Sequence, residues 1–258
     1  MPVDTAPLMI ETRLFGVRVH AGTQADAIDE ILGAARARSG GVVCVANVDM
    51  LTRAKSTTKL FDVMARARLV VTDGMPLVWA LRLLQKLPRT ERVRGPSLTL
   101  ALCERAAREG VSVFFYGGLA NELELMQAEL RRRYPTLKIA GAVSPPMLPA
   151  EPPADPSLVE QINASGAGLL FVGLGCPKQE YWMQAQQTPQ AQLKPISLGV
   201  GLAFALIAGT KSQAPRWMSD NGLEWLYRLC QEPGRLWKRY LVGNSLFVWY
   251  LLKALVGR

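Results

Sequence analysis

The chain has 258 residues, of which 49% are apolar, and a net charge of +9. This length can bury the core of one α/β domain plus an additional segment, and the positive charge favours a polyanionic or membrane-surface partner. Because His20 is the only histidine, most histidine-rich metal sites are excluded and a Ser/His/Asp catalytic scheme is disfavoured.

The first predicted elements are a short hairpin and a helix. Thr12–Val19 alternates in polarity around Gly16, which predicts a β-hairpin or an edge strand. Thr23 precedes apolar residues at helical spacing, so we expect it to cap a helix. Met1–Met9 has no basic region and is not expected to act as a secretory signal.

Four apolar runs each end in a polar or glycine-rich turn and are followed by a helical pattern. They are Val42–Ala46 before Asn47, Leu69–Thr72 before Asp73–Gly74, Val113–Tyr116 before Gly117–Gly118, and Leu170–Val172 before Gly173–Gly175. Such units are typical of parallel sheets, and further strands are expected near Lys138–Ala142 and Ile196–Val200. We therefore predict an α/β fold: a mostly parallel, Rossmann-like sheet of roughly six strands with helices on both faces.

The turns after parallel strands lie at one edge of the sheet, where ligands bind. We therefore expect Asn47, Asp73 and the glycine turns to meet at one place. Backbone amides of Gly117, Gly118 and Gly175 are candidates for contacting an anion.

The pattern changes after about Ala214. A short amphipathic helix is expected to end near Pro233, and a second one places Arg235, Lys238 and Arg239 on one face. Ser245–Val256 is apolar and aromatic but shorter than a membrane-spanning helix.

This composition favours a helix that lies on an anionic membrane surface; the alternative is a helix packed on the core with solvated charges. We predict an α/β catalytic domain over residues 1–218 and a basic amphipathic appendage over residues 219–258.

Asp73 is the strongest candidate for catalysis. A carboxylate at the end of a strand can accept a proton from an attacking hydroxyl, although aspartate is also a common helix N-cap, and the spacing is compatible with both roles. No glycine turn completes GxGxxG, and no Walker or Asp-x-Asp sequence occurs. The sequence predicts no metal site, so arginines and helix dipoles would neutralise a diphosphate leaving group.

Several segments together resemble a known family. They are Ala46–Asp49, Thr72–Pro76, Glu91–Gly95, Phe115–Gly118, Val172–Glu180, Ala214–Trp217, Gly222–Leu229 and Glu232–Arg235. In this order they resemble the WecB/TagA/CpsF family of bacterial glycosyltransferases, from about Thr12 to Tyr240.

The resemblance implies an inverting, metal-independent glycosyltransferase without a cofactor. It would move a sugar from a UDP-sugar to an undecaprenyl-diphosphate-linked saccharide in surface polysaccharide synthesis. It would act as a peripheral protein on the cytoplasmic face of the bacterial inner membrane. The family allows a homo-oligomer, and no nucleic-acid partner is expected.

The resemblance also implies roles for individual residues. Asp73 resembles the base that deprotonates the acceptor hydroxyl, and Asn47 would lie beside it. Arg92 would contact a phosphate or sugar, and Gln179 would hydrogen-bond the donor. Cations of the appendage would meet the diphosphates: Arg228, Arg235, Lys238 and Arg239.

One departure concerns the donor. Members often carry aspartate where this chain has Ala205, which removes an acceptor for ribose or sugar hydroxyls. The Thr72–Pro76 and Ser144–Pro146 segments resemble the exopolysaccharide (GumM-like) branch more than the teichoic-acid branch. Ala205 also favours the alternative of a non-catalytic protein that binds a nucleotide-sugar or lipid diphosphate. A Rossmann oxidoreductase is a third alternative, disfavoured by the absent dinucleotide fingerprint.

Overall fold

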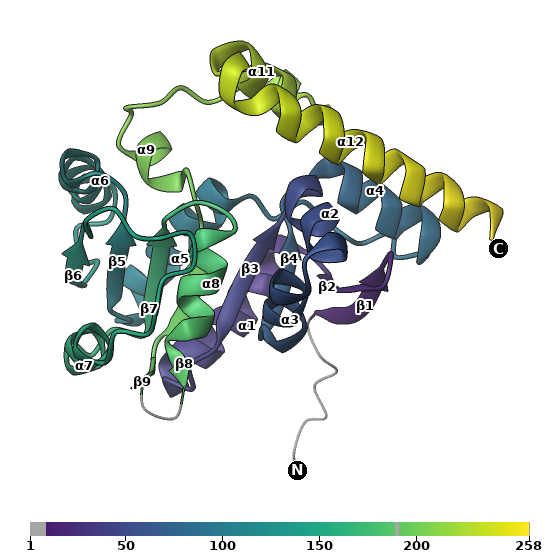
Figure 1. Ribbon diagram of the computed structural model, residues 1–258. Helices are drawn as coiled ribbons and strands as arrows, with labels where there is room; N and C mark the ends of the chain where they lie inside the picture. The colour runs from purple at the N-terminus through teal and green to yellow at the C-terminus, as the bar shows by residue number, and fades with distance from the viewer. Residues whose placement is uncertain (1–8, 189–190, 258) are drawn as a thin grey trace.

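The computed structural model describes residues 9–188 and 191–257 (Figure 1). Residues 1–8, which belong to the N-terminal segment considered above, lie outside the described residues. The first elements are β1 (Ile10–Leu14) and β2 (Val17–Ala21), an antiparallel pair separate from the main sheet. The predicted hairpin around Gly16 is therefore confirmed.

The central sheet has six strands, all parallel, in the order β4-β3-β10-β7-β5-β6. The strands are β3 (Val42–Ala46), β4 (Leu69–Thr72), β5 (Val113–Gly117), β6 (Ile139–Val143), β7 (Leu169–Gly173) and β10 (Ile196–Gly199). A small antiparallel ribbon, β8 (Gln187–Thr188) and β9 (Ala191–Gln192), precedes β10. The predicted parallel α/β fold is confirmed.

Helices cover both faces of the sheet, so successive side chains of a strand are buried in two different cores. In β3, Cys44 belongs to one core while Val43 and Val45 belong to the other. The first core contains side chains of α2 (Val48–Ser56), α3 (Thr58–Arg66), α4 (Met75–Leu84), α7 (Pro156–Ala164) and α8 (Lys178–Ala185). The second contains side chains of α1 (Gln24–Ala37), α5 (Gly95–Glu109), α6 (Ala120–Arg133) and α9 (Ala203–Ile207). As predicted, Thr23 caps α1, where it forms a capping box with Asp26.

The C-terminal part is helical: α10 (Arg216–Asp220), α11 (Glu224–Gln231) and α12 (Pro233–Val256). Figure 1 shows α12 crossing over α2 and α4, with which it is in contact. Leu236, Gly243 and Phe247 form its buried side, and the Phe247 ring lies 5.3 Å from that of Phe15 in the β1–β2 turn. In the described part of the chain, no helix is both long and apolar enough to cross a membrane.

Candidate active site

The strand ends converge on one polar cavity of about 310 Å³, as predicted. Its lining includes Asn47 after β3, Asp73 after β4, Gly118 after β5, Gly173 and Gly175 at the end of β7, and Gly199 and Gly201 at the end of β10. Ala205 also lines this cavity. Residues of α11 and α12 also line it. A cavity at the carboxyl ends of parallel strands is the usual ligand site of such folds.

Asp73 does not act as a helix cap. Gly74 is the N-cap of α4, and no side chain caps that end of the helix. The Asp73 side chain is 25% exposed and borders both the polar cavity and the groove described below. Burial, reinforced by the negative charge of Glu224, raises its pKa above the ordinary aspartate value, while Arg92 opposes the shift. Of the two roles that the spacing allowed, the helix cap is therefore not observed, and the general base stays a prediction.

Arg92 connects the turn after β4 to α10 and α11. Its Nε donates to the backbone oxygen of Asp73, and its Nη1 donates to the backbone oxygen of Ser219 at 2.9 Å. Its Nη2 donates to Glu224 Oε2 at 2.6 Å and lies 3.8 Å from Asp73 Oδ1. All three guanidinium nitrogens therefore have protein partners, and Arg92 contacts the predicted base directly.

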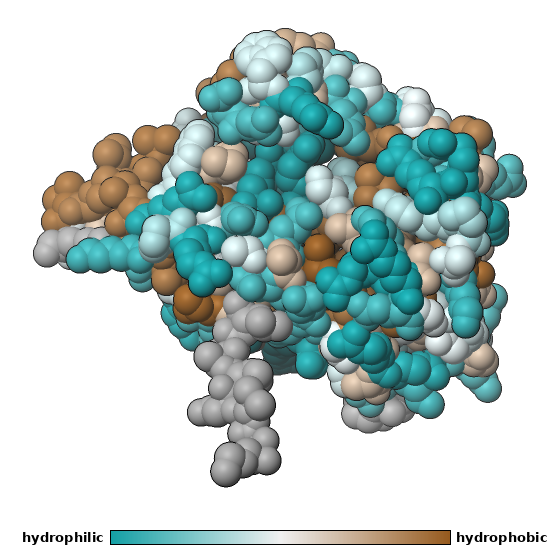
Figure 2. Space-filling model, turned by 180° about the vertical axis from the view of Figure 1, so that it is seen from behind, coloured by the Kyte–Doolittle hydropathy of each residue, from teal (hydrophilic) through white to brown (hydrophobic). Residues whose placement is uncertain are grey.

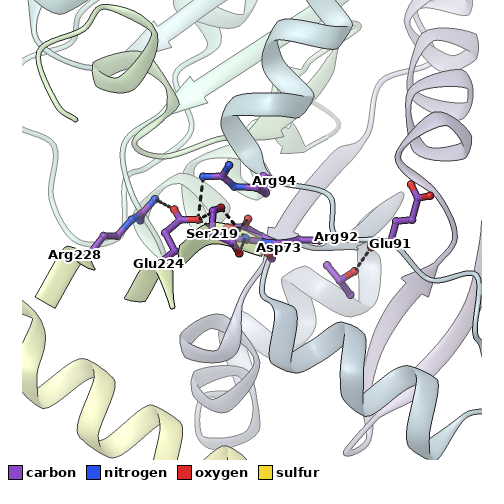
Figure 3. A network of polar contacts seen from close by, with 8 residues as sticks. Asp73, Glu91, Arg92, Arg94, Ser219, Glu224 and Arg228 are labelled. Carbon is purple, nitrogen blue, oxygen red and sulfur yellow. Dashed lines mark hydrogen bonds and ion pairs between the residues drawn. The ribbon is translucent and has the colours of Figure 1, made fainter. Parts of the chain in front are cut away.

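Glu224, at the start of α11, joins three arginines (Figure 3). Its Oε2 contacts Arg92 at 2.6 Å and Arg94 at 2.9 Å, and its Oε1 accepts from Arg228 at 2.8 Å. Burial alone would raise the pKa of Glu224, but the three arginines together hold it below the ordinary glutamate value. This carboxylate therefore stays ionised and holds α11 against the loop that carries Arg92 and Arg94.

Gln179 lies in the floor of the polar cavity, where it is almost completely buried. Its Oε1 accepts from the amides of Gly175 and Gly201, each at 3.1 Å, and its Nε2 donates to Glu180 Oε1 at 2.8 Å. Gln179 thus fixes two glycine turns against each other. Glu180 is fully buried, and burial raises its pKa to about 7.

The glycine amides proposed for anion binding have other partners. The amide of Gly118 donates to Gly173 O at 3.0 Å, and that of Gly175 donates to Gln179. Gly117 is not part of the cavity lining. Its φ is +109°, and a Cβ there would lie 2.7 Å from the Gly173 backbone, so glycine permits the close approach of β5 and β7. Gly118 and Gly175 line the cavity without side chains that would fill it.

The remaining predicted residues divide between the cavity and the surface. Asn47 lines the cavity and caps α2, its Oδ1 accepting from the Met50 amide. Arg228, Arg235 and Arg239 line the cavity, whereas Lys238 does not and lies over the Trp237 ring. Arg239 Nε is 2.9 Å from Asp49 Oδ2, yet these two buried atoms form no hydrogen bond in the described structure.

A second cavity of about 360 Å³ adjoins the first. Two sets of apolar side chains face each other across it: Met75, Pro76 and Trp79 on α4, and Phe247, Val248 and Leu251 on α12. We call it the α4–α12 groove. Asn47, Asp73, Arg228, Arg239 and Tyr240 line both cavities, so the groove opens onto the polar cavity beside Asp73.

Sequence reasoning assigned no role to Glu224, Ser219 or Trp79. For Glu224 a signal was present: it is four residues before Arg228, a spacing at which carboxylate and guanidinium pair on a helix. Its contacts with Arg92 and Arg94 join segments about 130 residues apart, so no local pattern indicates them.

The fold is that of an α/β protein with a parallel, Rossmann-like sheet, and its cavity, lined by a carboxylate and arginines, lies where such folds bind ligands. The model of the glycosyl transferase WecG/TagA/CpsF family matches residues 12–258 of the chain. The protein therefore belongs to this family of glycosyltransferases, which act in the synthesis of surface polysaccharides.

Proposed function

We propose that the protein is an inverting, metal-independent transferase that moves a sugar from a UDP-sugar to an undecaprenyl-diphosphate-linked saccharide. The observation that carries this proposal is the position of Asp73, at the junction of a polar cavity and an apolar groove. A nucleotide-sugar suits the first chemistry and a lipid-linked acceptor suits the second. Arg228 and Arg239 line both cavities and are placed to meet phosphate groups on either substrate.

Direct displacement accounts for the chemistry. Asp73 accepts the proton of the acceptor hydroxyl, whose oxygen forms a bond to the anomeric carbon of the donor sugar. The bond from that carbon to the diphosphate oxygen breaks, and UDP leaves with the electron pair. Arginines of α11 and α12 offset the negative charge that develops on the leaving group. The raised pKa of Asp73 makes it a stronger base than an exposed aspartate.

The outer face of α12 supports a location on an anionic membrane. Trp237, Leu241, Trp249, Leu252 and Leu255 are exposed there, and the helix also carries Lys238 and Lys253. Apolar and aromatic side chains combined with basic ones are typical of helices that lie in the membrane interface. We place the protein peripherally on the cytoplasmic face, where polyprenyl-diphosphate acceptors would reach Asp73 from the bilayer.

A UDP-release assay tests the proposal. It presents a panel of UDP-sugars with a short-chain prenyl-diphosphate glycoside, with and without EDTA. We expect release with one donor, no effect of EDTA, and a loss of about 10²–10⁴-fold in Asp73→Asn. Full activity of Asp73→Asn at saturating substrates would contradict the role of the base, and inhibition by EDTA would contradict metal independence.

Ala205 supports the alternative of a non-catalytic binding protein, because it lines the cavity without a polar side chain. UDP binding without turnover across the panel would favour this alternative. Restoration of release by Ala205→Asp would then identify that position as the cause. The Thr72–Pro76 segment, which contains Asp73 and joins β4 to α4, favours the exopolysaccharide branch of the family.

A further inference from the structure

The α4–α12 groove changes in polarity along its length. At the end beside Asp73 its lining is charged and includes Arg228, Arg239 and Glu224. Farther along α12 the lining is formed by Phe247, Val248 and Leu251. A ligand that fills the groove would therefore carry its polar group near the base and an apolar chain away from it.

The groove follows the axis of α12 toward its C-terminal end. Arg239 and Leu251 are twelve residues apart on one helix, which corresponds to about 18 Å at about 1.5 Å per residue. Beyond Leu251, the helix exposes Leu252, Leu255 and Val256. Figure 2 shows the apolar surface of this protruding end from behind. An apolar chain leaving the groove would thus continue along an apolar helix end.

The polar end of the groove carries two arginines, Arg228 and Arg239. Arg239 Nε lies 2.9 Å from Asp49 Oδ2, so the ion pair with this buried carboxylate orients the guanidinium. Both cations line the end of the groove near Asp73 and offer positive charge to a diphosphate there.

We propose that the α4–α12 groove binds the isoprenoid units that lie next to the diphosphate of the acceptor lipid. This inference rests on the proposed function and adds the location of the lipid chain. It distinguishes two apolar surfaces of α12. The inner one, with Val248, holds the first part of a single lipid chain, whereas the outer one, with Val242, faces the bilayer.

Two valines on α12 provide a matched test. Val248 and Val242 are 53% and 57% exposed, but only Val248 lines the groove. Val248→Trp should fill the groove, whereas Val242→Trp adds the same volume outside it. The full chain and both variants are titrated calorimetrically with farnesyl diphosphate, dimethylallyl diphosphate, inorganic pyrophosphate, farnesol and UDP. Trp79→Ala provides a second change, on the α4 wall of the groove.

We expect farnesyl diphosphate to bind the unchanged protein at least about tenfold more tightly than dimethylallyl diphosphate, because more carbon atoms are buried. Farnesol should bind weakly, since it lacks the charged group. Val248→Trp should remove the advantage of the longer chain while binding of pyrophosphate and UDP is retained. Val242→Trp should behave as the unchanged protein, and Trp79→Ala should weaken only farnesyl diphosphate and farnesol.

The proposal is overturned if affinity does not depend on chain length, or if both tryptophan variants lose farnesyl diphosphate equally. Retained UDP and pyrophosphate binding shows that a variant is folded. These titrations require no sugar transfer, so their outcome is separate from that of the UDP-release assay. Transfer without a chain-length effect would overturn the groove alone, and chain-length-dependent binding without transfer would overturn the proposed function alone.

Discussion

A single guanidinium separates Asp73 from Glu224. Arg92 Nη2 lies 3.8 Å from the Asp73 carboxylate and 2.6 Å from that of Glu224. Glu224 is on α11, so the electrostatic environment of the candidate base depends on the position of this helix. The negative charge of Glu224 raises the pKa of Asp73, whereas Arg92 lowers it. Helix α11 therefore influences the protonation of Asp73, the predicted base.

Glu224→Gln should alter the pH dependence of transfer. A general base must be unprotonated, so activity rises with pH through the pKa of Asp73. Removing the Glu224 charge lowers that pKa, so the acidic limb of the kcat/KM profile should move to lower pH. At neutral pH the rate should fall about tenfold, because Arg92, Arg94 and Arg228 lose their common charged acceptor.

The control for this variant is Glu129→Gln on α6. Glu129 also pairs with two arginines, Arg132 and Arg133, but it does not line either cavity. Its pH profile should match that of the unchanged protein. A Glu224→Gln enzyme with lower activity and an unmoved acidic limb would show that Glu224 is only structural.

The fold could be predicted because its signals are local. Each strand is an apolar run followed by a turn residue, and the helical period returns after each turn. The number of such strand–turn–helix units predicts the size of the central sheet. The sequence also predicts that Asn47 and Asp73 lie close together, since parallel strands end at one edge of the sheet.

The arrangement of the appendage could not be predicted in the same way. Spacing alone placed Arg235, Lys238 and Arg239 on one helix face. In the structure the rotation of α12 is set by Leu236, Gly243 and Phe247, which are buried, so Arg239 faces Asp49 while Lys238 lies at the surface. Likewise, the partners of Glu224 depend on contacts between distant segments.

Gln179→Leu should weaken donor binding. Leucine has a similar size but cannot accept from the Gly175 and Gly201 amides, so the two glycine turns lose their common partner. We expect the affinity for UDP to fall about tenfold and the free energy of unfolding to fall by about 1–3 kcal/mol. Calorimetric UDP titration and chemical denaturation measure the two effects.

Gln127→Leu on α6 is the matched change, because the Gln127 side chain donates to the Leu123 carbonyl and accepts from Arg131 but lines neither cavity. It should leave UDP affinity unchanged. If Gln179→Leu lost stability but bound UDP normally, the glycine turns would have no part in holding the donor.

Replacement of two outer side chains of α12 should release the protein from membranes. Trp249 and Leu252 are exposed and do not line the groove. Trp249→Glu with Leu252→Glu introduces charges that oppose insertion into an anionic interface. Co-sedimentation with anionic vesicles should fall strongly, while UDP binding should persist. Salt should also weaken association of the unchanged protein, since the screening length shortens from about 8 Å at physiological ionic strength to about 3 Å at 1 M.

Leu119→Glu with Leu125→Glu controls for added negative charge, because both leucines are exposed in the α6 region. This pair should sediment like the unchanged protein. If both double variants lost co-sedimentation equally, vesicle binding would depend on net charge and α12 would have no specific role in it.

Glu180→Gln should change how stability depends on pH. The fully buried Glu180 carboxyl has a pKa of about 7, against an ordinary value of 4.5. Between these values the folded protein keeps a proton that the unfolded chain releases, so this group makes stability fall as pH rises. Above pH 7 the accumulated cost is about 3 kcal/mol. Glutamine keeps an oxygen that can accept from Gln179 Nε2 but does not ionise.

The measurement is the free energy of unfolding of both proteins by urea at pH 5 and pH 8. The difference between Glu180→Gln and the unchanged protein should shift in favour of the variant by up to about 3 kcal/mol between these values. Glu160→Gln, at an exposed position of α7, should show no such shift. A difference that stays constant from pH 5 to pH 8 would mean that Glu180 does not retain its proton in the folded protein.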